Sequence, residues 1–137
     1  MASNLAAQGK ASEAEPLFRK ALDIHERVLG ADHPDTATGY NNVASNLDAQ
    51  GKASEAEPLH RKALDIYERV LGTDHPDTAK GYNNVASNLI AQGKVPESEP
   101  LLRKALDILE RVLGSNHPNT KTVRANLEEC IRRQSQS

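Results

Sequence analysis

Residues 43–84 read VASNLDAQGKASEAEPLHRKALDIYERVLGTDHPDTAKGYNN, and this stretch recurs along the chain with a period of 42 residues. Residues 1–42 differ from it only at positions 1, 6, 18, 25, 31 and 38. A third copy starts at Val85 and diverges mainly after Gly114. Because a fixed period of roughly 20 to 50 residues is typical of solenoids and other repeat arrays, the sequence predicts one repetitive domain.

The apolar residues of one copy predict two helices. They recur at steps of three and four residues, which places them on one face of each helix. The first stripe ends before Gly51 and consists of Ala37, Tyr40, Val43, Ala44 and Leu47. The second ends at Gly72 and consists of Ala53, Ala56, Leu59, Ala63, Leu64, Ile66, Val70 and Leu71. Glycine after each stripe is typical of a helix end.

Two positions of the second helix, seven residues apart, change their side chains from copy to copy. They are occupied by Phe18 and His25, then by His60 and Tyr67, and then by Leu102 and Leu109. Both positions fall near the middle of the apolar stripe. We therefore predict that these side chains pack between repeats.

The connector GTDHPDT at residues 72–78 is predicted to start the next helix. Asp74 is the predicted cap, and Asp77 favours the positive end of the helix. A histidine in each connector also raises the question of a metal or acid–base site. Since His33 and His75 lie about two helix diameters apart, or ~20 Å, they cannot share one metal ion. Helix capping is therefore the predicted role of the connector.

The recurring motifs NN, QGK, EAEPL, RKAL and LGxDHPDT resemble the tetratricopeptide repeat. They are similar to its 42-residue variety, which is found in kinesin light chains and in sensor regions of bacterial and fungal multidomain proteins. The resemblance covers essentially the whole chain and implies an all-α fold. This fold is an α-solenoid of antiparallel helix pairs stacked into a right-handed superhelix, with the first helix of each pair on the inner face. Leu47 and Ala53 stand where the family usually carries aromatic residues, so we expect a less aromatic core.

We expect residues 1–137 to form a single array. Its units are residues 1–30 with a truncated leading helix, residues 31–72, residues 73–114, and a C-terminal capping helix over residues 115–137. Met1 aligns with Val43, so the first unit lacks the front half of its first helix. The capping helix is more polar than its counterparts, as the end of a solenoid requires. At the other end, the apolar face of residues 11–29 is predicted to be open and to allow a homo-oligomer.

Composition and charge argue against several classes of function. The 17 basic and 19 acidic residues give no positive field for nucleic acid, and no apolar run is long enough to cross a membrane. Cys130 is the single cysteine, which is typical of a reducing, cytoplasmic setting. We find no phosphate-binding loop, no metal-ligand spacing and no nucleophile with a fixed base. The sequence therefore predicts no cofactor, no metal and no enzymatic activity.

The residues that lie opposite the Tyr40 stripe or at its side form the candidate peptide-binding groove. They are Asn41, Asn42, Ser45, Asp48, Lys80, Asn83, Asn84, Ser87 and Ile90. The resemblance implies that Asn42 and Asn84 clamp the main chain of a bound peptide, because an asparagine amide both donates and accepts hydrogen bonds. The alternative is that these amides only bond neighbouring helices. Selectivity is predicted where the copies differ, at Ala6, Asp48 and Ile90, and at Thr38 and Lys80.

We therefore predict a protein-interaction scaffold that binds an extended peptide or partner segment in the concave groove of the array. The alternative is a structural array that self-associates, because near-identical units with an open first edge could stack between chains. Either role fits an excerpt of a larger adaptor or signalling protein.

Overall fold

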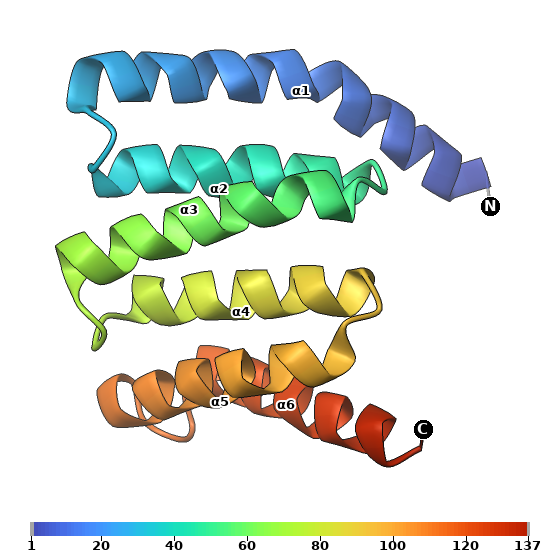
Figure 1. Cartoon of the computed structure of the whole chain (residues 1–137), viewed down its shortest axis with the longest axis vertical. Helices are drawn as coiled ribbons and strands as arrows, with labels where there is room; N and C mark the ends of the chain where they lie inside the picture. Colours follow the sequence, from blue (N-terminus) through green and yellow to red (C-terminus); the bar gives the residue numbers. More distant parts are fainter. Residues whose placement is uncertain (1, 137) are drawn as a thin grey trace.

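The computed structural model describes residues 2–136, with side chains from residue 8 onward, and contains six helices joined by short turns (Figure 1). The helices are α1 (Ala2–Leu29), α2 (Pro34–Ala49), α3 (Ala53–Leu71), α4 (Pro76–Ala91), α5 (Val95–Val112) and α6 (Pro118–Ser135). Each helix packs mainly against its neighbours in sequence, and no strand occurs in the described part of the chain. The predicted all-α solenoid of helix pairs is therefore confirmed.

The turns between helices repeat along the chain. Gly51 has a φ of +79°, a left-handed conformation that favours glycine and ends α2. His75 is the N-cap of α4. Its Nδ1 accepts a hydrogen bond from the backbone N–H of Asp77 at 3.0 Å. Capping by the connector is therefore confirmed, but the predicted cap, Asp74, is wrong. Asp74 lies one residue too early and instead pairs with Arg111 of α5 at 2.6 Å.

The first unit differs from the prediction in its leading segment. By analogy with Gly51, the period suggests a turn at Gly9, yet α1 continues through Gly9 as one helix of 28 residues. A segment of about two turns cannot form a stable helix of its own, because nucleation costs more than so few hydrogen bonds return. The residues before Gly9 therefore extend α1 and do not fold back on it. Met1 lies outside the described residues.

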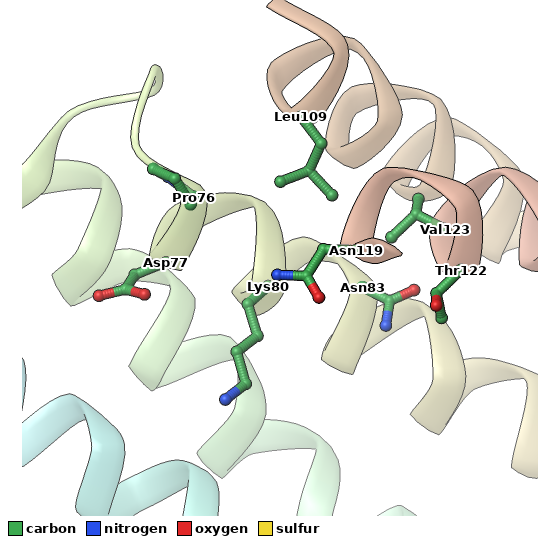
Figure 2. A pocket seen from close by; sticks show the side chains of 8 residues that line it. All are labelled: Pro76, Asp77, Lys80, Asn83, Leu109, Asn119, Thr122 and Val123. Carbon is green, nitrogen blue, oxygen red and sulfur yellow. The ribbon is translucent and has the colours of Figure 1, made fainter. Parts of the chain in front are cut away.

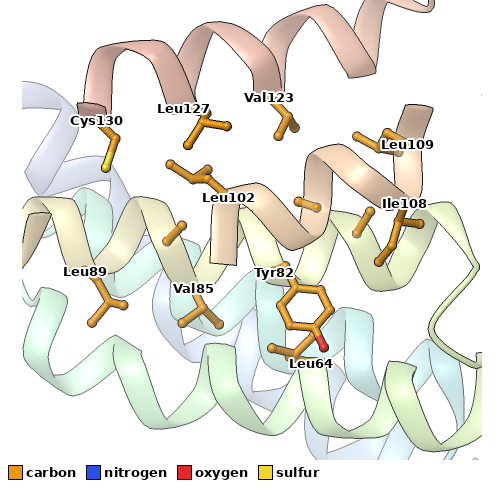
Figure 3. Packing of buried hydrophobic residues seen from close by; sticks show 13 residues of the cluster. Leu64, Tyr82, Val85, Leu89, Leu102, Ile108, Leu109, Val123, Leu127 and Cys130 are labelled. Carbon is orange, nitrogen blue, oxygen red and sulfur yellow. The ribbon is translucent and has the colours of Figure 1, made fainter. Parts of the chain in front are cut away.

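Two clusters of buried apolar residues form the core. The first lies between α1, α2 and α3, and the second joins α4, α5 and α6 to Leu64 of α3 (Figure 3). All five residues of the predicted α2 stripe are buried, which confirms that face. The predicted α3 stripe is correct in its middle, but Val70 in its last turn is exposed.

The variable positions of the second helices pack between repeats wherever a helix lies on both sides. His60, Tyr67, Leu102 and Leu109 are all buried, which confirms the prediction for the two later copies. In α1, by contrast, Phe18 is 38% exposed. The reason is that α1 has a neighbour on one side only.

Candidate functional site

The candidate groove residues lie on α2 and α4, the first helices of their pairs. Six of them expose their side chains fully or in part: Asn42, Ser45, Lys80, Asn83, Asn84 and Ser87. Ile90 is half-buried and packs against the second core cluster. The remaining two are described below: Asn41 is buried, and Asp48, whose side chain is 30% exposed, bonds to α3 and α4.

A hollow of about 330 Å³ lies between the N-terminal halves of α4 and α6 (Figure 2). Its lining consists of Pro76, Asp77, Lys80 and Asn83 of α4, Leu109 of α5, and Asn119, Thr122 and Val123 of α6. Leu109 and Val123 are buried and form an apolar floor, whereas Lys80 and Thr122 are exposed at the rim. We call this space the first hollow.

A second hollow of about 210 Å³ lies between the C-terminal halves of the same two helices. It is lined by Ser87 and Ile90 of α4 and by Asn126, Glu129, Cys130 and Arg133 of α6. Four of the predicted groove residues therefore line the two hollows: Lys80, Asn83, Ser87 and Ile90. Asn84 lies between them on α4 but lines neither hollow. We call this surface the α4–α6 groove.

Asp48 does not face an open groove. One carboxylate oxygen accepts a hydrogen bond from His60 Nε2 at 2.8 Å, and the other accepts one from Asn88 Nδ2 at 2.9 Å. The carboxylate thus joins α2 to α3 and α4. The helical arithmetic placed Asp48 at the side of the apolar stripe but could not show that side chains of α3 and α4 bond to it. Ala6, at the equivalent position, lies outside the residues whose side chains are described.

Asn41 is also covered. It is 7% exposed, and its side-chain oxygen has no hydrogen-bond partner among the described residues. It lies beside the phenol of Tyr67, which reaches α2 from α3 and contacts Thr38 Oγ1 at 2.7 Å. Burial is the main cause that raises the pKa of Tyr67. Asn41 is therefore a packing residue of the joint between α2 and α4.

The joint between the second and third repeats differs from the next one by a correlated exchange. Asp48, His60 and Asn88 correspond, one period later, to Ile90, Leu102 and Cys130. The first set is hydrogen-bonded, whereas Leu102 and Cys130 are fully buried in the second core cluster. A free buried cysteine behaves as a small apolar side chain. The earlier joint therefore has a polar contact between Asp48 and Asn88, whereas the later joint has the second hollow, whose surface is partly apolar.

Several residues of the groove come from α6 and are absent from the prediction. Asn126 lies one period after Asn84, so the repeat itself could have identified it. Its amide donates a hydrogen bond to Asn83 Oδ1 at 3.2 Å across the groove. Glu129 pairs with Arg132 and with Arg133, the latter at 3.3 Å.

Metal-binding clusters and membrane-spanning helices would each bear on function. No group of three or more histidine, cysteine or acidic side chains is arranged there to hold a metal ion. No helix in residues 2–136 combines the length and the apolar character that crossing a bilayer requires. The geometry thus offers two hollows and a row of amides as its recognition features.

Comparison with protein families identifies the repeat. A family model described as tetratricopeptide repeat matches residues 1–69 and 40–94. A second model with the same description matches residues 78–119. No curated protein matches the chain.

Solved structures give the same result for the fold. One is a candidate kinesin light chain from Podosopora anserina with nearly identical TPR-like repeats; it shares 24% identity and a TM-score of 0.86 over 97% of this chain. Another is BtubC (BKLC) from P. vanneervenii, with 24% identity and a TM-score of 0.80 over 92% of this chain. The matched regions span 64% and 50% of those two chains, respectively, so both relatives are longer.

Proposed function

This chain belongs to the tetratricopeptide repeat family, whose members are generally protein-interaction scaffolds, and we propose that it binds an extended segment of a partner protein in the α4–α6 groove. The observation that supports this proposal most directly is the pair of hollows along one groove, because concave sites with a few polar groups are the usual form of a binding site.

The row of asparagines along the groove supports recognition of a main chain. Asn83 lines the first hollow, Asn126 lines the second on the facing helix, and Asn84 lies between the two hollows. Each amide can donate to a peptide carbonyl and accept from a peptide N–H, and this pairing does not depend on the side chains of the partner. The hollows then supply selectivity for individual side chains.

The joint between α2 and α4 is a poorer site by the same criteria. Tyr67 fills the place that corresponds to the first hollow, and Asp48 with Asn88 fills the place that corresponds to the second. We therefore assign binding to α4 and α6 and not to the whole array. The proposal involves no cofactor or nucleic acid, and the single, buried Cys130 fits a reducing cytoplasm.

The test is peptide binding measured by fluorescence anisotropy, with labelled unstructured peptides and with two amide variants. Asn84→Ala and Asn126→Ala are each expected to weaken binding roughly three- to tenfold, because each removes about one hydrogen bond. Asn42→Ala is the matched control, since it removes the equivalent amide from α2 and is expected to leave affinity unchanged. Equal losses for Asn42→Ala and Asn84→Ala would place binding elsewhere.

Self-association is a second candidate function, and the surface of α1 favours it. Leu17 and Val28 are 71% and 74% exposed, more than their counterparts in α3, where Leu59 is half-buried and Val70 is 45% exposed. The opposite end of the stack is less suited to cover this face, because Arg124 and Glu128 of α6 replace Tyr82 and Ala86. A second copy would therefore dock α1 against α1.

Sedimentation velocity over a hundredfold concentration range tests this second candidate. A mass that rises above 14.9 kDa, and that Val28→Lys returns to the monomer value, would support an α1–α1 contact. Val112→Lys is the control, because Val112 is the equivalent residue of α5 and is 41% exposed. A constant monomer mass for the unmodified chain would rule this contact out.

A further inference from the structure

Tyr67 is a side chain of this protein that already occupies the equivalent of the first hollow. It extends from α3 into the joint between α2 and α4, is 5% exposed, and contacts Thr38 at the rim of that joint. The side chain of Asn41 and the carboxylates of Asp35 and Asp77 lie near enough to its hydroxyl to affect its pKa. Thr38 thus contacts the phenol, and the other three residues lie within electrostatic range of it.

One period later, the same four positions line the first hollow. They are occupied by Lys80, Asn83, Asp77 and Asn119. The position of Tyr67 itself is taken by Leu109, which also lines the hollow. The two sites share these four positions, whereas Val123 of the first hollow corresponds to Gly81 in the earlier site. In the earlier site the chain supplies an aromatic ring, and in the later one its shorter leucine leaves the space open.

We propose that the first hollow binds an aromatic side chain of the partner peptide, with phenylalanine preferred over tyrosine. This inference rests on the proposed function and names the side chain that the groove selects. The volume of about 330 Å³ lies at the lower end of the range of roughly 300–1,000 Å³ that is typical of ligand pockets. An aromatic ring is the largest rigid apolar group that a peptide can bury there.

The preference for phenylalanine follows from the direction of entry. Tyr67 comes from inside the protein, and its hydroxyl meets Thr38 at the rim. A ring from a partner enters from the rim, so its tip meets the apolar floor of Leu109 and Val123. A tyrosine hydroxyl buried there would lose its hydrogen bonds to water and gain no protein partner from these two side chains.

The polar residues at the rim of the first hollow can bind the peptide main chain that carries the ring. Asn83 and Asn119 present amides, and Lys80 is exposed and takes part in no ion pair found among the described residues. Its ammonium group can lie over the face of a bound ring, an attraction that a neutral apolar side chain such as leucine would not gain. An aromatic ring is therefore favoured over an aliphatic side chain of similar size.

The experiment compares three capped nine-residue peptides of alanine, glycine and serine that differ only in the central residue: phenylalanine, tyrosine or alanine. By isothermal titration calorimetry, the phenylalanine peptide is expected to bind at least tenfold more tightly than the alanine peptide, with tyrosine between them. Leu109→Tyr copies the residue of the preceding repeat, which that joint accommodates, and is expected to remove the phenylalanine advantage.

The reciprocal variant gives a second measurement. Tyr67→Leu is expected to open the equivalent space between α2 and α4 and to raise the stoichiometry of the phenylalanine peptide from one to two. In the unmodified chain, methyl NMR signals of Leu109 and Val123 are expected to shift with the phenylalanine peptide and not with the alanine peptide. This last readout does not depend on the folding of any variant.

The outcomes separate the aromatic site from the proposed function. If the three peptides bind equally and Asn84→Ala weakens all of them, the groove binds main chain and the aromatic site is rejected. If no peptide binds the unmodified chain, both proposals are rejected. A phenylalanine advantage that persists in Leu109→Tyr would also overturn the assignment to the first hollow.

Discussion

At the scale of single residues, the contact of Asp48 with His60 and Asn88 shows how a few side chains define one joint of the array. His60 is 2% exposed, and its Nδ1 has no hydrogen-bond partner among the described residues. Its Nε2 donates to Asp48, whose side chain is 30% exposed. If a buried imidazole loses its single hydrogen-bond partner, the unpaired polar group destabilises the folded protein.

Asp48→Ile is therefore expected to destabilise the protein by about 1–3 kcal/mol, because it leaves His60 and Asn88 without their shared acceptor. The triple variant Asp48→Ile, His60→Leu and Asn88→Cys copies Ile90, Leu102 and Cys130 and is expected to recover most of that loss. Urea denaturation measures both. If the triple variant is no more stable than Asp48→Ile, the three positions do not act as a set.

Tyr82 gives a second prediction at this scale. Its burial and, to a smaller extent, its hydrogen bond to Glu68 at 2.8 Å raise the pKa of Tyr82 to about 12, above the ordinary tyrosine value of about 10. Because folding favours the neutral phenol, the stability that this shift contributes is present below pH 10 and is lost as the pH rises from 10 to 12. Tyr82→Phe is expected to reduce this alkaline loss, as thermal unfolding at pH 8 and pH 11 would show. An identical alkaline loss in both proteins would contradict the assignment.

At the scale of elements, equivalent glycines have different roles. Gly51 has a φ of +79° and ends α2, whereas Gly9, one period earlier, lies inside α1. An added Cβ at Gly9 would meet nothing within 4 Å. The same residue in the same local sequence is thus a helix terminator in one copy and a helix interior residue in another. The difference is that the chain turns after α2 and leads into α3, whereas α1 runs on through Gly9 as one helix.

Gly9→Ala and Gly51→Ala are therefore expected to have opposite effects on stability. Alanine in the helix interior is expected to stabilise α1 by about 0.5–1 kcal/mol, because it restricts the unfolded chain. Alanine at Gly51 is expected to destabilise the protein by about 1 kcal/mol, because its backbone is strained at a positive φ. Urea denaturation of the matched pair checks both signs. Destabilisation by Gly9→Ala would instead indicate a turn there.

At the scale of the whole molecule, stability depends on contacts between neighbours along the stack. Each internal helix packs mainly against the helices before and after it in sequence, whereas α1 and α6, at the ends of the stack, each have one such main neighbour. In such a nearly one-dimensional array, the ends open at a lower free-energy cost than the middle. The two ends are not equivalent, because α6 is polar on its open face and α1 carries Leu17, Ile24 and Val28 there.

Hydrogen exchange followed by mass spectrometry is expected to show the lowest protection in α1 and the highest in α3 and α4. The physical reason is that α1 lacks packing on one face, so its local opening costs less free energy. The measurement belongs at low protein concentration, with a repeat at high concentration that would reveal protection by self-association. Equal protection of all helices at low concentration would show instead that the array unfolds as one cooperative unit.

The sequence by itself was sufficient for the features that depend on local spacing. The period of 42 residues, the apolar stripes and the glycines predicted α2 and α3, and the repeat placed α4 and α5 by translation. The buried stripe from Ala37 to Leu47 was correct because helical periodicity alone decides which residues of a helix share one face. The family resemblance rested on the same motifs, and the family models confirmed it.

The tertiary structure alone decided which of the outward residues are accessible. Asn41 and Asp48 have the same helical positions as Asn83 and Ile90, yet Tyr67 packs beside Asn41 and Asn88 bonds to Asp48, while hollows open at the second two. Tyr67 and Asn88 lie about 26 and 40 residues away in sequence, so no local pattern contains them. Local spacing decides which residues of a helix share one face, but the side chains of other helices decide whether that face is open, because packing joins residues that are distant along the chain.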